Sequence, residues 1–169
     1  FDVDSTLIQE EVIELLAEQA GKRAEVTAIT EAAMRGELDF AESLKARVAA
    51  LSGLPESVIR DTFERIRFTP GVVDLIDHIH AVGGLVGAVS GGFSQILEPL
   101  AERLRLDFHL ANKLGVVDGR LTGQVDGPII DKAAKALALE QWAVKSGIAI
   151  ENTIAVGDGA NDLQMLSTA

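Results

Sequence analysis

The chain has 169 residues, of which 47% are hydrophobic and 24% are charged, so it can bury a full core as one domain with an insertion. Its formal net charge is −11 and it contains no cysteine. Nucleic acid is therefore not expected as a partner, and disulfides and thiolate metal sites are excluded. No apolar run approaches the ~18 residues of a membrane span, and we expect no membrane partner and a cytoplasmic location.

The first third of the chain is predicted to be helical. Apolar side chains recur with helical spacing after Glu10, and no strand pattern interrupts the sequence up to Ile66. Four helices are expected there: one after Glu10, one over 23–34 that ends at Gly36, one over 40–51 and one that opens at Pro55.

From Thr69 onward, predicted strands and helices alternate, which indicates parallel βαβ units. Asp118-Gly119 between two short apolar runs predicts a hairpin turn. The expected elements, in chain order, are a helix over 69–80, a strand over 85–89, a tight loop over 90–92, a helix over 93–104, a strand over 107–111, a hairpin over 114–123, a helix over 131–145, a strand over 153–156 and a helix from 162.

The predicted fold class is α/β, with a Rossmann-like parallel-sheet core and an inserted helical cap. The core would comprise residues 1–9 and 69–169, the cap residues 10–68, and a hairpin flap about residues 112–127. Because a strand of about 5–6 residues should present Asp2 and only Phe1 precedes it, we expect the core to continue beyond both ends of this sequence.

Acidic side chains follow two of the predicted strands. Asp2 and Asp4 come after the first strand, and Asp158 and Asp162 come after the last. The carboxyl ends of parallel strands meet at one edge of a sheet, where ligands bind. An oxygen-rich pocket of this kind suits a hard cation such as Mg²⁺.

Phosphate-binding groups are predicted at the same edge. The Ser90 hydroxyl and the Gly91 N–H follow the second strand, and Lys135 lies early in a later helix. A carboxylate can attack phosphorus if a cation reduces the repulsion between the two anions, and a second acid such as Asp4 can move the proton. The residues thus suggest phosphoryl transfer through Asp2.

The ordered set of motifs resembles the haloacid dehalogenase (HAD) superfamily of phosphatases along essentially the whole chain. Within that superfamily the sequence is most similar to the phosphoserine phosphatases. The segments that carry this similarity are Asp2–Ile8 with Glu11, 33–36, Leu38–Phe40, Ser43–Leu44, Arg47–Val48, Val89–Phe93 and Gly157–Asp162.

The resemblance implies Mg²⁺-dependent hydrolysis of O-phospho-L-serine to L-serine and phosphate, the last step of serine biosynthesis. Asp2 would be the nucleophile that forms a phospho-aspartyl intermediate, and Asp4 the general acid and base. The implied Mg²⁺ ligands are Asp2, the backbone carbonyl of Asp4, and Asp158. Phosphate would be bound by Ser90, Gly91 and Lys135. Asn161, as a further substrate-binding residue, and Asp162 would support the site.

The resemblance also assigns substrate contacts to the helical cap. Glu11 and Arg47 would bind the ammonium and carboxylate groups of the substrate, which suits a zwitterionic amino acid because arginine grips a carboxylate with two hydrogen bonds. Met34 and Phe40 would form apolar walls, and the cap would close over the site and exclude water.

Several alternatives stay open at this point. Lys132 is a second candidate for the phosphate-binding lysine, although Lys135 fits the spacing better. The nearest alternative function is the same chemistry on phosphothreonine, phosphohomoserine or a sugar phosphate, and the next is a non-catalytic phosphate- or metal-sensing module. The sequence does not fix the oligomeric state, and a homodimer is one option.

Overall fold

A computed structural model describes residues 1–34 and 37–169, except for the side chains of residues 33 and 34. The predicted role of the Met34 side chain and the predicted helix end at Gly36 therefore lie outside the described part. Four helices follow the first turn of the chain, as expected: α1 (Val12–Gln19), α2 (Arg23–Met34), α3 (Phe40–Ala49) and α4 (Ser57–Phe63).

The rest of the chain forms an α/β core around a sheet of three strands in the order β1-β2-β3. The strands are β1 (Gly87–Phe93), β2 (Phe108–Val117) and β3 (Arg120–Asp126). The helices of this part are α5 (Val72–Ala81), α6 (Ser94–Leu104), α7 (Lys132–Ser146) and α8 (Leu163–Thr168). Strands β1 and β2 are parallel, with Gly87 opposite Phe108 and Ser90 opposite Ala111, which confirms the predicted α/β class.

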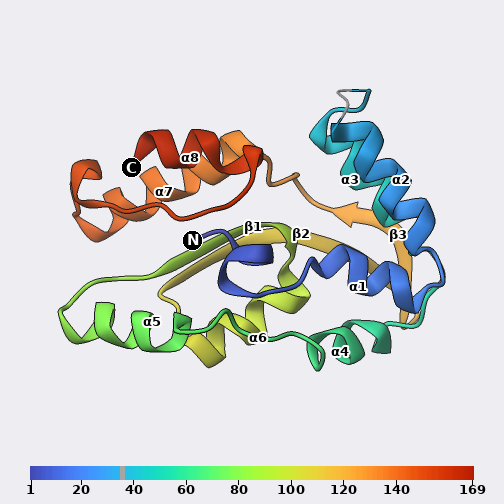
Figure 1. The fold of residues 1–169 in the computed structure, drawn as a ribbon, viewed down its shortest axis with the longest axis horizontal. Helices are drawn as coiled ribbons and strands as arrows, with labels where there is room; N and C mark the ends of the chain where they lie inside the picture. Colours follow the sequence, from blue (N-terminus) through green and yellow to red (C-terminus); the bar gives the residue numbers. More distant parts are fainter. Residues whose placement is uncertain (35–36) are drawn as a thin grey trace.

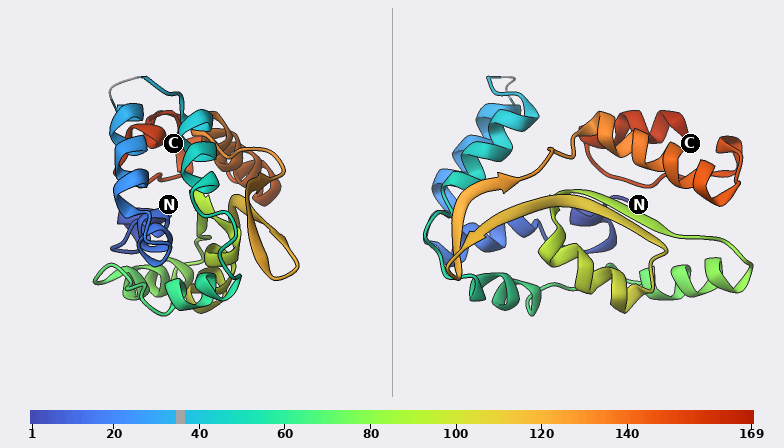
Figure 2. Two further views of the ribbon diagram at one scale, coloured as in Figure 1. Left: turned by 90° about the vertical axis from the view of Figure 1, so that its right-hand side faces the viewer. Right: turned by 180° about the vertical axis from the view of Figure 1, so that it is seen from behind.

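Helices cover both faces of the sheet. Helices α7 and α8 lie on one side of β1 and β2, whereas α5 and α6 lie on the other, and the helices α1 to α3 gather at one end (Figures 1 and 2). Ile96, Leu97 and Leu100 of α6 are almost completely buried, as its apolar spacing requires. Among the described residues, no helix has the length and apolar character that a membrane span demands.

Strand β2 is longer than the sequence predicted. The expected strand over 107–111 and the first strand of the expected hairpin form one continuous strand, which pairs with β1 at its start and antiparallel with β3 at its end. The predicted turn is confirmed, because Asp118 and Gly119 both have positive φ angles, of 49° and 69°.

Two other boundaries differ from the prediction. Strand β1 begins at Gly87 rather than Leu85, because the Val86 N–H donates to the Asp107 side chain instead of to a strand, and it continues through the expected loop to Phe93. Helix α4 begins at Ser57, two residues after Pro55, because Pro55 pairs in an extended bridge with Arg120.

The predicted strand over 153–156 is wrong as a paired strand. These residues are extended, but only one backbone hydrogen bond, from Asp2 N to Val156 O (2.8 Å), joins them to the strand-like start of the chain. Phe1 and Asp2 lie between this segment and β1, since Val89 N of β1 donates to Phe1 O (2.9 Å).

The helical segment is attached to the core at two places. Its two connections to the core lie side by side, with Ile8 bridged to Phe68 and Gln9 N donating to Arg67 O (3.0 Å). The loop between α3 and α4 also pairs with the β2–β3 hairpin, since Gly53 N donates to Leu121 O (2.8 Å) and Leu121 N donates to Leu54 O (2.9 Å). The helices are therefore held over the carboxyl end of β1.

Candidate active site

Asp2 emerges between two loops that carry polar side chains. The Val89 N–H of β1 donates to Phe1 O (2.9 Å), and Asp2 N donates to Val156 O on the other side (2.8 Å). Asp2 therefore lies between Ser90, on the strand β1, and the loop that contains Asp158. An irregular helical turn, η1 (Val3–Leu7), then carries the chain away from the sheet.

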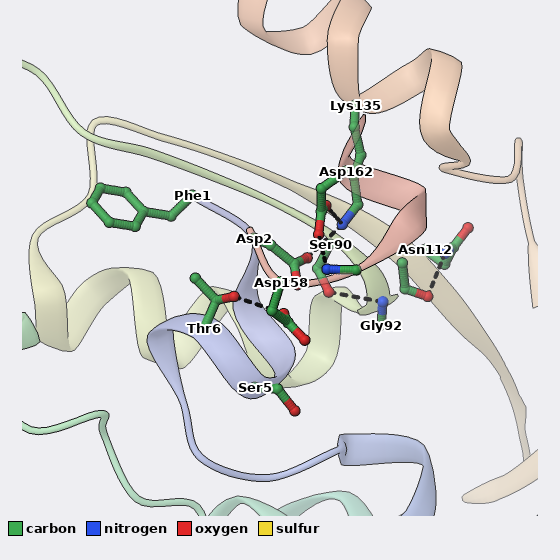
Figure 3. A network of polar contacts seen from close by, with 12 residues as sticks. Phe1, Asp2, Ser5, Thr6, Ser90, Gly92, Asn112, Lys135, Asp158 and Asp162 are labelled. Atoms are coloured by element: carbon green, nitrogen blue, oxygen red, sulfur yellow. Dashed lines mark hydrogen bonds and ion pairs between the residues drawn. The ribbon is translucent and has the colours of Figure 1, made fainter. Parts of the chain in front are cut away.

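Lys135 connects the two acidic clusters. Its Nζ lies 2.5 Å from Asp2 Oδ1 and 2.7 Å from Asp162 Oδ1, and its side chain is completely buried (Figure 3). Asp131 caps the N-terminus of α7 by accepting from Ala134 N (2.9 Å), which starts the helix in the register that points Lys135 inward. Lys132 is exposed, so the structure places Lys135 rather than Lys132 in the site.

Three carboxylates form a compact cluster. Ligand oxygens of Asp2, Asp158 and Asp162 lie within 4.8 Å of one another. Thr6 Oγ1 donates to Asp158 Oδ1 (2.8 Å) and orients it (Figure 3). Hard carboxylate oxygens at this spacing fit a cation such as Mg²⁺. The Asp4 carboxylate is outside this cluster, and the predicted metal contact of Asp4, which was through its backbone carbonyl, stays a prediction.

The Asp4 side chain faces the cleft between η1 and the strand β1. Its Oδ2 accepts a hydrogen bond from Val12 N (3.0 Å), and its buried Oδ1 has no hydrogen-bond partner among the described residues. Burial raises the pKa of Asp4 to about 8, and the negative charge of Glu11 adds to this effect. A raised pKa favours the protonated form of Asp4, which is the form that a general acid needs.

Burial also raises the pKa of Asp2, although the positive charge of Lys135 opposes this effect. The hydrogen bond from Lys135 goes to Asp2 Oδ1. The Asp2 carboxyl group is thus paired with the Lys135 ammonium group, whereas no ion pair is described for Asp4. This difference favours an ionised Asp2 beside a protonated Asp4.

The segment Ser90–Gly92 is shaped by two close approaches. Ser90 is buried, and its Oγ accepts from Gly92 N (2.8 Å). A Cβ atom at Gly92 would lie 3.0 Å from Ser90 Oγ, which is a tight contact, and 3.4 Å from Asp4 Oδ1, which is an ordinary one, so a side chain there would press on the Ser90 hydroxyl. Gly157 plays a similar part, because a Cβ there would lie 2.5 Å from Asp162 Cγ.

Asn112 supports this segment and was missed by sequence reasoning. Its Nδ2 donates to Gly91 O (2.9 Å), and its Oδ1 accepts from Ile130 N (2.8 Å) (Figure 3). Its side chain is buried, so these bonds fix the backbone of Gly91 to the residues before α7. The one available signal was a polar residue between the apolar runs 108–111 and 114–117, and it did not distinguish Asn112 from a surface residue.

A cleft of about 180 Å³ brings the predicted residues together. Nine of the predicted site residues line it, namely Asp2, Asp4, Glu11, Phe40, Arg47, Ser90, Gly91, Asp158 and Asn161. Lys135 and Asp162 do not line it and lie behind Asp2, where they hold its carboxylate. Ile13 and Leu44, from α1 and α3, add apolar wall that the sequence did not predict.

The helical segment contributes one anion and one cation to the cleft. Glu11 lies at the start of α1 and accepts a hydrogen bond from Ser5 Oγ (2.6 Å). Arg47, near the end of α3, is half-buried, and its Nε donates to Ser43 O (3.3 Å). Burial lowers the pKa of Arg47, while the charges of Glu11 and Asp4 oppose the shift. A ligand in the cleft would therefore meet both a negative and a positive side chain from the helical segment.

Comparison with known proteins agrees with this geometry. The sequence profile of the haloacid dehalogenase-like hydrolases matches residues 1–167. The chain is 57% identical over 169 residues to a phosphoserine phosphatase of Mycobacterium tuberculosis, of which it spans 41%. It is 52% identical over 168 residues, or 99% of its length, to a phosphoserine phosphatase of Streptococcus thermophilus, of which it spans 78%.

Two solved structures have the same fold over the full length of this chain. One is a phospho-aspartyl intermediate analogue of a phosphoserine phosphatase, with a TM-score of 0.93 and 43% identity, of which this chain covers 81%. The other is a substrate-bound phosphoserine phosphatase complex, with a TM-score of 0.94 and 43% identity, of which it covers 80%.

The buried lysine can be tested against the exposed one. Lys135→Met should lower the free energy of unfolding by about 3–5 kcal/mol, because it leaves Asp2 and Asp162 buried without their cation. Lys132→Met, in the same helix, should change it by less than about 0.5 kcal/mol. Urea unfolding of the two variants measures the difference, and equal stabilities would contradict the structural role of Lys135.

Proposed function

Because the chain belongs to the haloacid dehalogenase-like hydrolase family, we propose that it hydrolyses O-phospho-L-serine to L-serine and phosphate through a phosphorylated Asp2. The observation that carries this proposal is the cleft itself. It is lined by Asp2 and Ser90 together with Glu11 and Arg47, which come from the helical segment. This arrangement suits a small molecule with a phosphate at one end and an amino acid at the other.

Binding would use both ends of the substrate. Arg47 would pair with the carboxylate and Glu11 with the ammonium group. Ser90 Oγ and the Gly91 N–H would donate to phosphate oxygens, and Asn161, at the rim of the same cleft, would donate to another. Phe40, from the start of α3, would cover the substrate and exclude water.

In the first chemical step, Asp2 Oδ2 would attack phosphorus while the bond to the serine oxygen breaks. Asp4 would give its proton to that oxygen, so that L-serine leaves as a neutral alcohol. Lys135 would keep Asp2 in position through Oδ1. In the second step Asp4, now ionised, would take a proton from water, and the hydroxide would attack phosphorus to release phosphate and free Asp2.

We further propose Mg²⁺ as the cation of the site, held by Asp2, the backbone carbonyl of Asp4, and Asp158. Bound there, the ion would offset the negative charge that Asp2 and the phosphate bring together. Asp162 is proposed as a supporting residue, because it is already committed to Lys135 (2.7 Å). The proposed partner is a small phosphoamino acid of the cytoplasm.

The amino-acid end of the substrate is tested by Arg47→Ala. The loss of a charged hydrogen-bonding pair should raise KM for phosphoserine roughly 10- to 100-fold, and change KM for p-nitrophenyl phosphate by less than about threefold. Lys45→Ala, an exposed cation on the same helix, is the matched control and should leave both substrates unaffected. An equal effect of Arg47→Ala on both substrates would refute the carboxylate-binding role.

The alternative substrates are compared by measuring kcat/KM for phosphoserine, phosphothreonine, phosphohomoserine and sugar phosphates. The proposal predicts the highest value for phosphoserine.

Removal of the metal tests the proposed cation. Dialysis against EDTA should abolish turnover of both phosphoserine and p-nitrophenyl phosphate, because the cation acts at the phosphate end. Added Mg²⁺ should restore it, and Asp158→Asn should raise the Mg²⁺ concentration needed for half-maximal activity by about tenfold or more. Full activity after chelation would show that the site works without a metal.

A further inference from the structure

The turn that follows Asp4 contacts the start of α1 through three hydrogen bonds. Val12 N donates to Asp4 Oδ2 (3.0 Å). Ser5 donates twice, from its backbone N to Glu10 O (3.3 Å) and from Oγ to Glu11 Oε1 (2.6 Å). The turn η1 therefore contains the proposed proton donor, Asp4, and contacts the proposed ammonium-binding residue, Glu11, through Ser5.

Ser5 has an unusual backbone conformation. Its φ of 57° and ψ of 6° lie in the left-handed region, which few residues other than glycine, asparagine and aspartate adopt readily. Ser5 is one of three non-glycine residues with positive φ in the described part of the chain. The conformation directs the Ser5 hydroxyl across to the connection that leads into α1, where it meets the Glu11 carboxylate.

Glu11 needs such a contact to be held in one place. It is an exposed residue just before the first turn of α1, and its long side chain has several rotamers. An ionised carboxylate only accepts hydrogen bonds, and a hydroxyl that donates to it makes a short, charge-assisted bond. The bond from Ser5 fixes Oε1 and leaves Oε2 for a ligand in the cleft.

We propose that Ser5 is a positioning residue, which holds the Glu11 carboxylate toward the cleft and so sets the affinity for substrates that carry an ammonium group. This inference rests on the proposed function, in which Glu11 binds that group. Ser5 is not among the described residues that line the cleft, and the hydrogen bonds described for it go to Glu10 and Glu11. Its effect is therefore confined to the amino-acid end.

Two nearly isosteric variants test the donor directly. Asparagine and aspartate both tolerate left-handed backbone, so Ser5→Asn and Ser5→Asp preserve the turn. The amide of the first can donate to Glu11, whereas the carboxylate of the second repels it. Ser5→Ala should raise KM for phosphoserine about 3- to 10-fold with kcat within about twofold. The KM of Ser5→Asn for phosphoserine should stay near that of the parent protein, and the KM of Ser5→Asp should be higher than that of Ser5→Ala.

The same variants are measured with p-nitrophenyl phosphate, which has no ammonium group, and their kcat/KM for it should stay within about twofold of the parent. Equal KM values for the Asn and Asp variants on phosphoserine would overturn the positioning role. So would a fall in kcat on both substrates, because it would show that Ser5 acts on the catalytic turn as a whole.

Glu11→Gln separates this inference from the proposed function. If Glu11→Gln raises KM for phosphoserine alone while the Ser5 variants do not, the positioning role fails and the proposed function stands. If Glu11→Gln affects both substrates equally, the ammonium-binding role fails and the role of Ser5 fails with it. If the Ser5 variants and Glu11→Gln both raise KM for phosphoserine alone, the results support the positioning role of Ser5 and the ammonium-binding role of Glu11 together.

Discussion

The buried contact of Lys135 with Asp2 and Asp162 is the interaction on which the rest of the site depends. The three charged groups come from distant parts of the chain and are almost completely buried. Lys135 Nζ lies 2.5 Å from Asp2 Oδ1 and 2.7 Å from Asp162 Oδ1. Buried charges are costly unless they are paired, so each of the three requires the others. The contact ties the start of the chain, α7 and the segment around Asp162 into one arrangement.

The remaining contacts place a phosphate and an amino acid around Asp2. Asn112 fixes the backbone of Gly91, and the lack of a side chain at Gly92 leaves room for the Ser90 hydroxyl. The helical segment contributes Glu11 and Arg47 to the lining of the same cleft. The loop between α3 and α4 pairs with the β2–β3 hairpin, and the two connections between the helical segment and the core pair with each other. These backbone hydrogen bonds hold the helical segment in place without the charged side chains of the cleft.

Much of the site could be predicted from sequence, because its acids and donors follow strands whose ends must meet at one edge of the sheet. Lys135 was favoured over Lys132 by spacing and by resemblance alone, and the cap of α7 at Asp131 supplies the physical reason. Asn112 and Ser5 were not predicted as functional residues, since their roles arise from hydrogen bonds between segments that only the fold brings together. The residues 153–156 are not assigned as a paired strand in the structure, and their apolar pattern alone does not distinguish an extended segment from a paired strand.

The central claim is that Asp2 becomes phosphorylated during turnover. It is tested most directly by mixing the protein with phosphoserine that carries a radioactive phosphate, stopping the reaction with acid within the first turnover, and mapping the label by peptide mass spectrometry. The account predicts an acid-stable, base-labile phosphoryl group on Asp2, and no label on Asp2→Asn. Label on Ser90 or any other residue, or full turnover by Asp2→Asn, would contradict it.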